Sequence, residues 1–205
     1  MSSAYFYILN NILNSKNHEI IKSDIGLLEY KDGSSDKIKS HKFINSMGIG
    51  FDAKVGKLQK ENENFTGILS YLIAVIKALF NYKMIDLSSI TLNNEIVGEK
   101  LMISIGNGKC SGGGFYLNPD ALIDDGYLDI SIFDKISRRR LVTALPMALL
   151  NKLHKVPEVT MEKADSLEIE LKNPYYVHCD GEIVTDSLVH GKISIIRNAV
   201  NIIKL

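Results

Sequence analysis

The stretch SLEIELKNPYYVHCDGE, residues 166–182, contains two runs typical of β-strands followed by an acidic turn. Ser166–Leu171 alternates polar and apolar residues, and Tyr175–Cys179 is a short apolar run rich in aromatic residues. The strand pattern stops at Asp180-Gly181-Glu182, and Asp-Gly is typical of tight turns. We therefore expect two carboxylates, those of Asp180 and Glu182, to lie where the chain reverses direction.

Similar strand patterns occupy most of the chain and are separated by short turn signals, such as Asn93-Asn94. The repeated βαβ alternation of a parallel sheet does not occur. The sequence therefore predicts a mostly-β (α+β) fold, an antiparallel β-sandwich with helical insertions. The other expected strands are 25–30, 42–47, 89–92, 95–97, 101–105, 128–133 and 192–197; the expected helices are 4–14, 51–58, 67–80 and 138–153, the last kinked or split at Pro146.

The composition is that of a globular protein with one sizeable core. Of 205 residues, 45% are apolar and 23% are charged, and Lys+Arg equals Asp+Glu at 24 each. This balance argues against broad nucleic-acid binding, although Arg138-Arg139-Arg140 forms a local basic patch that suits phosphate or a lipid headgroup. Cys110 and Cys179 have no metal-type spacing, and no signal-peptide pattern occurs, so a cytoplasmic protein with free thiols is expected.

The most apolar stretch is Gly67–Phe80. It is shorter than the roughly 20 residues that span a bilayer, and it carries Lys77, so a buried core helix is favoured. The alternative is an interfacial helix that touches lipid, which would make the protein peripheral at the membrane.

Two glycine-rich segments follow expected strands. Gly48–Ala53 has the GxGxxA spacing of a dinucleotide-binding turn, but no parallel βαβ sheet surrounds it, so a tight strand-to-helix turn is favoured. Further along, Asn107-Gly108 precedes Gly112-Gly113-Gly114. Such a loop either exposes backbone N–H groups to a phosphate or simply connects strands, and the residues alone leave both readings open.

Two acidic turns offer carboxylates for chemistry. In Leu122–Tyr127, the pattern Asp124-Asp125-Gly126 allows a carboxylate and backbone carbonyls to converge on Mg²⁺, although a plain Asp-Gly turn is the more frequent meaning of this pattern. Asp180-Gly181-Glu182 has the same plain alternative. The five histidines show no HExxH-type spacing, so no zinc site is expected, and His178 is expected to make a structural hydrogen bond.

Taken in order, these segments resemble the C-terminal domain of bacterial diacylglycerol kinases and sphingosine kinase-like lipid kinases. The resemblance covers the chain from about residue 20 to its end. In that family ATP donates its γ-phosphate to a lipid hydroxyl, and a β-sandwich carries the lipid-binding cleft. The matching segments are Asn45–Ala53, Asn107-Gly108 with Gly112-Gly113-Gly114, Pro119–Asp129 and Asp180–Glu182.

The resemblance implies roles for individual residues. Glu182 corresponds to the proton acceptor, and Asp180 to its acidic partner. Asp125 corresponds to the Mg²⁺-binding aspartate, and Leu122 and Tyr127 offer backbone carbonyls to the same ion. A carboxylate that accepts a hydroxyl proton while a cation steadies the local geometry is coherent phosphoryl-transfer chemistry.

The resemblance also implies partners and a domain division. The family's Gly-Gly-Asp-Gly-Thr motif, which belongs to an N-terminal nucleotide domain, does not occur in the sequence, and neither does a P-loop. We therefore expect residues 1–22 to be a helix or linker from such a domain and residues 23–205 to be the lipid-kinase C-terminal domain. The expected partners are ATP, a lipid substrate at a membrane surface, a nucleotide-binding domain in cis or trans, and a second copy in a homodimer. The alternative function is a non-catalytic lipid-binding module or an inactive fragment.

Overall fold

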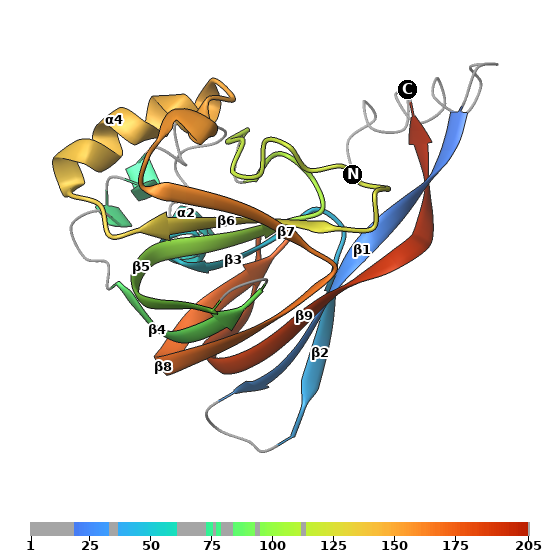
Figure 1. The fold of residues 1–205 in the computed structure, drawn as a ribbon, viewed down its shortest axis with the longest axis horizontal. Helices are drawn as coiled ribbons and strands as arrows, with labels where there is room; N and C mark the ends of the chain where they lie inside the picture. Colours follow the sequence, from blue (N-terminus) through green and yellow to red (C-terminus); the bar gives the residue numbers. More distant parts are fainter. Residues whose placement is uncertain are drawn as a thin grey trace.

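The computed structural model describes residues 19–32, 37–60, 73–75, 77–78, 84–92, 95–111 and 114–204. Within these residues the strands form one nine-stranded sheet in the order β2-β1-β9-β8-β3-β5-β6-β7, and β4 pairs with β5 and β8 (Figure 1). All of these pairings are antiparallel, which confirms the mostly-β prediction. The strands are β1 (Glu19–Asp32), β2 (Lys39–Phe43), β3 (Ser46–Gly50), β4 (Ile85–Thr91), β5 (Glu95–Gly106), β6 (Leu128–Asp134), β7 (Val159–Ala164), β8 (Ser166–Cys179) and β9 (Glu182–Lys204).

Strands β3 and β4 together close the sheet on itself. On one side, β3 pairs with residues 102–106 of β5, and β4 pairs with residues 95–100. On the other side, both strands pair with β8. The expected sandwich is therefore corrected to a single sheet with a closed ring, because β5 and β8 are each long enough to hold β3 and β4 one after the other. The chain between β3 and β4 leaves the sheet and carries the helical insertion.

Strands β1 and β9 form a long two-stranded arm that extends beyond the body of the sheet (Figure 1). Their pairing begins with Glu19 opposite Lys204, so the start of β1 and the end of β9 lie side by side. The expected helix over residues 4–14 lies outside the described residues. The assignment of residues 1–22 to a linker stays a prediction, and β1 already begins at Glu19.

Helix α2 (Phe51–Lys60) follows β3 directly and confirms the helix expected over residues 51–58. Gly50 makes this turn with φ +88°, and a Cβ at that position would lie 2.5 Å from the Ile85 side chain. The tight strand-to-helix turn therefore requires glycine for both its backbone angle and its space.

The described residues of the apolar 67–80 segment support a core helix. Residues 73–75 and 77–78 are helical, and Ala74, Val75 and Ala78 are buried against the sheet. The rest of the segment lies outside the described residues. Among the described residues, no helix is long and apolar enough to cross a membrane.

Helix α4 (Arg138–Leu149) lies over β6 and β7 on the outside of the molecule (Figure 1). The Ser137 side chain caps its first turn. The helix continues through Pro146 and stops before Asn151, which adopts a left-handed conformation at φ 56°. The expected helix over 138–153 is therefore shorter, and a separate 3₁₀ turn, η1 (Leu153–Lys155), follows it.

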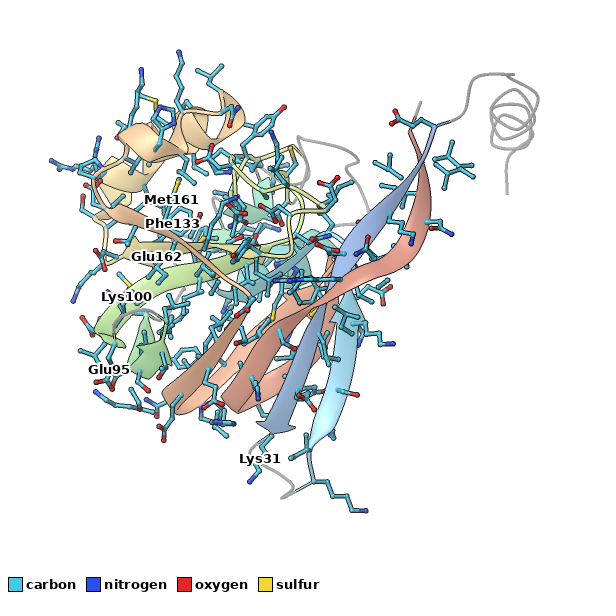
Figure 2. All side chains as sticks on the ribbon, turned by 45° about the vertical axis from the view of Figure 1, so that its right-hand side comes forward. Lys31, Glu95, Lys100, Phe133, Met161 and Glu162 are labelled. Atoms are coloured by element: carbon cyan, nitrogen blue, oxygen red, sulfur yellow. The ribbon has the colours of Figure 1, made fainter. Side chains whose placement is uncertain are left out.

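Two apolar cores hold the sheet and the helices together. The first consists of strand residues that face one another within the curved sheet. The second lies between the sheet and the helices and joins α2 and α4 to β5 and β6. Phe133 on β6 and Met161 on β7 lie beneath α4 in this second core (Figure 2). Each buried side chain of this size contributes about 1.5–3 kcal/mol, so α4 is held to the sheet by its inner apolar face.

Candidate functional site

Asp180 and Gly181 form a two-residue hairpin between β8 and β9. Their φ angles are 50° and 84°, and Cys179 and Glu182 pair across the hairpin. Positive φ at both central positions is characteristic of a type I′ turn, which favours Asp-Gly. Glu182 starts β9 and is exposed to solvent. The sequence prediction that both carboxylates lie at a chain reversal is therefore confirmed.

The Asp180 carboxylate holds a second turn, the one between β2 and β3. It accepts hydrogen bonds from the backbone N–H groups of Ile44 at 2.7 Å, Asn45 at 2.9 Å and Ser46 at 2.9 Å. The backbone N–H of Asp180 in turn donates to the Ser46 carbonyl at 2.8 Å. These contacts break the strand expected over residues 42–47 into β2 and β3, because the intervening N–H groups bind Asp180.

The start of the glycine-rich loop packs against the same turn. The backbone N–H groups of Asn107 and Gly108 both donate to the Asn45 carbonyl at 2.9 Å, and the Asn45 amide donates to the Cys110 carbonyl at 2.8 Å. A Cβ at Gly108 would collide with the Asn45 side chain. The N–H groups of Asn107 and Gly108 therefore serve the protein itself, while residues 112 and 113 lie outside the described part of the chain.

A buried hydrogen-bond path joins this turn to the second acidic turn. The Asn107 amide donates to the carbonyls of Ile44 and Asp24, each at 2.9 Å. The buried Asp24 carboxylate accepts from the Gly126 N–H at 2.8 Å and from the Asn198 N–H at 2.6 Å. The sequence prediction missed Asp24, because it is one of four acids in β1 and carries no motif of its own.

Asp125 in the second acidic turn contacts an ammonium group. Lys163 Nζ lies 3.1 Å from Asp125 Oδ2, 3.3 Å from Asp129 Oδ2 and 3.4 Å from the Asp120 carbonyl. The other Asp125 oxygen accepts the Tyr127 N–H at 3.0 Å. Lys163 also escaped the sequence prediction, because a lysine in a strand carries no motif of its own.

Burial and charge act in opposite directions on this cluster. Burial raises the pKa of Asp129, and the nearby Lys163 ammonium only partly offsets that effect. For Lys163, partial burial lowers the pKa, but contact with Asp125 and Asp129 outweighs it, so the net pKa is raised. Lys163 is therefore held as a cation between these two carboxyl groups.

The Asp125 turn as arranged does not fit Mg²⁺. This ion requires oxygen ligands at about 2.0–2.1 Å in octahedral geometry, and here the ammonium of Lys163 contacts the carboxylate that would supply one. Leu122 and Tyr127, the expected carbonyl donors, flank the turn and are exposed. No cluster of three or more His, Cys, Asp or Glu residues suited to a metal occurs in the described residues.

A buried pair connects α2 to the strand that ends at Asp180. His178 Nε2 lies 2.7 Å from Asp52 Oδ2, and both side chains are buried. A Cβ at Gly48 would lie 2.6 Å from this Asp52 oxygen and would also overlap the imidazole. Gly48 in the Asn45–Ala53 segment therefore provides space for the pair, and the expected structural hydrogen bond of His178 is confirmed.

An apolar pocket lies between α4 and the sheet. Its lining includes Met102, Phe115, Leu141 and Ala148, together with Asp52. The cavity volume is about 40 Å³, and a single water requires about 10–15 Å³. An acyl chain would therefore require α4 or its neighbours to move outward.

Burial makes the Cys179 thiol, which lies next to the hairpin, a poor nucleophile. Cys179, beside Asp180, is almost fully buried, and burial together with the Asp180 charge raises the pKa of its thiol to about 12. A thiol of this pKa is protonated at neutral pH and is a poor nucleophile. The carboxylates of the hairpin, and not this cysteine, remain the groups available for chemistry.

This arrangement of turns and strands occurs in known proteins. Residues 45–204 match the YegS C-terminal NAD kinase beta sandwich-like domain. The chain belongs to this family. The resemblance to lipid kinases that the sequence predicted is therefore confirmed at the level of the YegS-type family.

Individual relatives of this YegS-type domain carry kinase names. The chain is 32% identical over 163 residues to "Probable lipid kinase YegS-like" of Enterobacter sp. (strain 638), covering 78% of this chain and 52% of that protein. It is 28% identical over 147 residues to "Diacylglycerol kinase" of Staphylococcus aureus (strain bovine RF122 / ET3-1), covering 71% of this chain and 47% of that protein. The chain thus spans about half the length of the curated relatives it matches.

A solved structure shares the fold. The crystal structure of a diacylglycerol kinase from Bacillus anthracis str. Sterne has a TM-score of 0.60 and 20% sequence identity to this chain, covering 89% of it and 56% of the solved chain. At this identity the likeness concerns the fold alone. It supports the closed, antiparallel arrangement as the common scaffold of the matched region.

Proposed function

We propose that this YegS-type domain is the lipid-binding and catalytic-base half of an ATP-dependent lipid kinase of the diacylglycerol kinase type. The single observation that carries the proposal is the hairpin at Asp180-Gly181, which presents Glu182 to solvent beside a turn built from three distant segments. The kinase names of the relatives support the reaction class.

Glu182 is the proposed proton acceptor. Its side chain is exposed, and within the described residues no hydrogen bond or ion pair engages its carboxylate. The carboxylate takes the proton of the lipid hydroxyl as that oxygen forms a bond to the γ-phosphorus of ATP, and the bond from that phosphorus to the bridging oxygen of ADP breaks. General-base catalysis of this kind requires only a positioned carboxylate within hydrogen-bond reach of the hydroxyl.

Asp180 is the proposed positioning partner. Both of its carboxylate oxygens are engaged by backbone N–H groups of the Ile44–Ser46 turn. It therefore fixes the hairpin against this turn and leaves proton transfer to Glu182. The division of roles is consistent with two acids, two positions apart in the chain, that have different hydrogen-bond environments.

We also propose that the ATP site lies largely on a nucleotide-binding domain, joined to this chain or supplied in trans. The relatives are about twice as long as the matched region, and this sequence contains no phosphate-binding motif. Mg²⁺ binds at Asp125 only when Lys163 withdraws, since an ammonium and a divalent cation repel each other at one carboxylate.

The test is phosphate transfer from ATP to diacylglycerol by the chain together with a nucleotide-binding domain. Glu182→Gln lowers the rate by about 10²–10⁴-fold, the usual contribution of a general base. Glu170→Gln, at an exposed position on β8, removes the same charge and leaves the rate unchanged. Near-normal turnover by the Glu182 variant refutes its role as base. Lipid binding without turnover in any pairing favours the non-catalytic lipid-binding module instead.

A further inference from the structure

Helix α4 has an apolar surface on the side that faces away from the sheet. Leu141, Ala144 and Ala148 are buried on its inner side, as a surface helix requires. On the opposite side, Val142 is 58% exposed and Leu150 is 61% exposed. We call this side the outer face of α4, formed by Arg139, Val142, Thr143, Pro146, Met147 and Leu150.

The sequence of this helix and of the residues just after it is basic. Residues 138–157 contain five Lys or Arg residues and no Asp or Glu, whereas the whole chain is balanced. The Glu158 carboxylate, which follows this stretch, pairs with Arg140 at 2.9 Å. Arg139 at one end of the helix, and Lys152 and Lys155 beyond its other end, are exposed and make no ion pair among the described residues.

The placement of the arginines works against the helix itself. The first turn of α4 carries arginines and no acidic residue. The N-terminal end of a helix is the positive end of its dipole, so positive side chains there lower helix stability. Helix stability therefore does not explain Arg139, which has no ion-pair partner among the described residues, whereas Arg140 is balanced by Glu158.

We propose that the outer face of α4 docks on an anionic lipid bilayer. Val142, Met147 and Leu150 enter the region between headgroups and acyl chains, and the basic side chains at both ends contact anionic headgroups. The proposal deepens the proposed function and rests on it in one respect: the inner side of α4 lines the apolar pocket, so docking would place that pocket about one helix diameter, roughly 10 Å, from the source of a lipid substrate. Binding to the bilayer itself requires no kinase activity.

The charge favours a bilayer over a second copy of this chain. Two copies meeting through this face would bring Arg139, Lys152 and Lys155 of both copies together without acids to balance them. An apolar stripe with basic residues at both ends is instead typical of helices that lie in a membrane interface.

Co-sedimentation of the 205-residue chain with vesicles tests the proposal. The chain is expected to sediment with vesicles of equal parts phosphatidylglycerol and phosphatidylcholine, to remain in solution with pure phosphatidylcholine, and to dissociate as salt screens the charges. Arg139→Gln weakens binding about fivefold, the effect of one basic residue near an anionic surface. Leu150→Ser weakens it about tenfold through lost apolar burial.

Matched variants elsewhere on the surface serve as controls. Lys31 lies near the end of β1, well away from α4 (Figure 2), and Lys31→Gln removes one positive charge there. Val97 on β5 is 56% exposed, and Val97→Ser removes one exposed apolar side chain. Both controls are expected to bind vesicles as the unaltered chain does. Equal losses in the α4 variants and the controls overturn the proposal, as does an unaltered chain that fails to bind anionic vesicles.

Two further measurements separate the possible occupants and the two proposals. Sedimentation velocity without lipid is expected to give the same mass for the unaltered chain and Leu150→Ser; a dimer that this variant dissociates overturns docking in favour of a contact between copies. In an assay with a nucleotide-binding domain, Leu150→Ser is expected to slow phosphorylation of vesicle-borne diacylglycerol but not of a soluble short-chain analogue. Vesicle binding without any turnover contradicts the proposed kinase function and leaves docking supported.

Discussion

The Asp180 carboxylate holds the turns of the candidate site together, and replacing it measures how much it contributes to the free energy of unfolding. Asp180→Gly removes three hydrogen bonds to a charged acceptor while keeping the positive φ that the hairpin requires. Such bonds contribute about 1.5–3 kcal/mol each in protected sites. Because Asp180 is exposed and water replaces part of the loss, we expect about 1 kcal/mol for each bond, or about 2–3 kcal/mol in all.

Two other substitutions divide this loss into its causes. Asp180→Ala adds the cost of a left-handed backbone in a residue with a Cβ, about 1–2 kcal/mol, and is expected to be the least stable variant. Asp180→Asn retains one oxygen acceptor and tolerance of positive φ, so it is expected to lose only about 1 kcal/mol. Glu182→Gln, two residues away and without such bonds, is expected to change stability by less than about 0.5 kcal/mol.

Urea unfolding followed by far-ultraviolet circular dichroism provides the measurement. For a urea dependence of about 2 kcal/mol per molar, the midpoint of Asp180→Gly falls by about 1–1.5 M. The expected order of loss is Ala, then Gly, then Asn. A Gly variant as stable as the unaltered chain would show that the carboxylate does not hold the Ile44–Ser46 turn, and a Gly variant less stable than Ala would refute the assigned backbone conformation.

Two further predictions concern packing and pH. Gly48→Ala is expected to destabilise the fold by about 2–3 kcal/mol in urea unfolding, because its Cβ overlaps the buried Asp52–His178 pair. As a control, the Cβ of Gly56→Ala in α2 meets nothing within 4 Å, and this variant is expected to gain about 0.5–1 kcal/mol of stability. Equal changes in stability for the two variants would contradict the close packing of Gly48 against the Asp52–His178 pair. Lys163→Met is expected to raise the pKa of Asp129 further, since burial already raises it and no ammonium would then oppose that effect. A raised carboxyl pKa favours the folded state only while the group is protonated, so this variant is expected to lose about 1 kcal/mol of stability at neutral pH, and less as acid protonates Asp129. Carboxyl NMR titration measures the pKa of Asp129, and urea unfolding at neutral and at acidic pH measures the loss of stability. Isothermal titration is expected to detect tighter Mg²⁺ binding to this variant than to the unaltered chain.

Local signals predicted the elements whose causes lie close in sequence. The Asp-Gly hairpin at Asp180 forms as expected, because two residues that tolerate positive φ suffice to set a type I′ turn. Helix α2 likewise starts at the residue after Gly50, where the apolar period changes. The limits of such signals appear at Ile44 and Asn45, where an apolar strand pattern is broken by a carboxylate more than 130 residues away.

The closure of the sheet had no local signal at all. β3 and β4 share the same two neighbours, although residues 51–84, which include α2, separate them in the chain. Alternating patterns indicate which residues form strands, but the choice of partner depends on contacts between distant segments. Runs of short strands with turns between them are equally compatible with two stacked sheets and with one closed sheet, so the sandwich prediction was correct in class and wrong in closure.

The two acids of the hairpin can therefore be separated by experiment, because the fold has given them different environments. Asp180 is bound on both oxygens, so its loss should lower stability and activity together. The Glu182 side chain is exposed and makes no hydrogen bond or ion pair among the described residues, so its replacement should lower the catalytic rate at unchanged stability. If the hairpin were a plain Asp-Gly turn without chemistry, replacing Glu182 would change neither the catalytic rate nor the stability. A variant of Glu182 that keeps the unfolding midpoint but loses turnover would thus distinguish a catalytic carboxylate from a residue that only completes a turn.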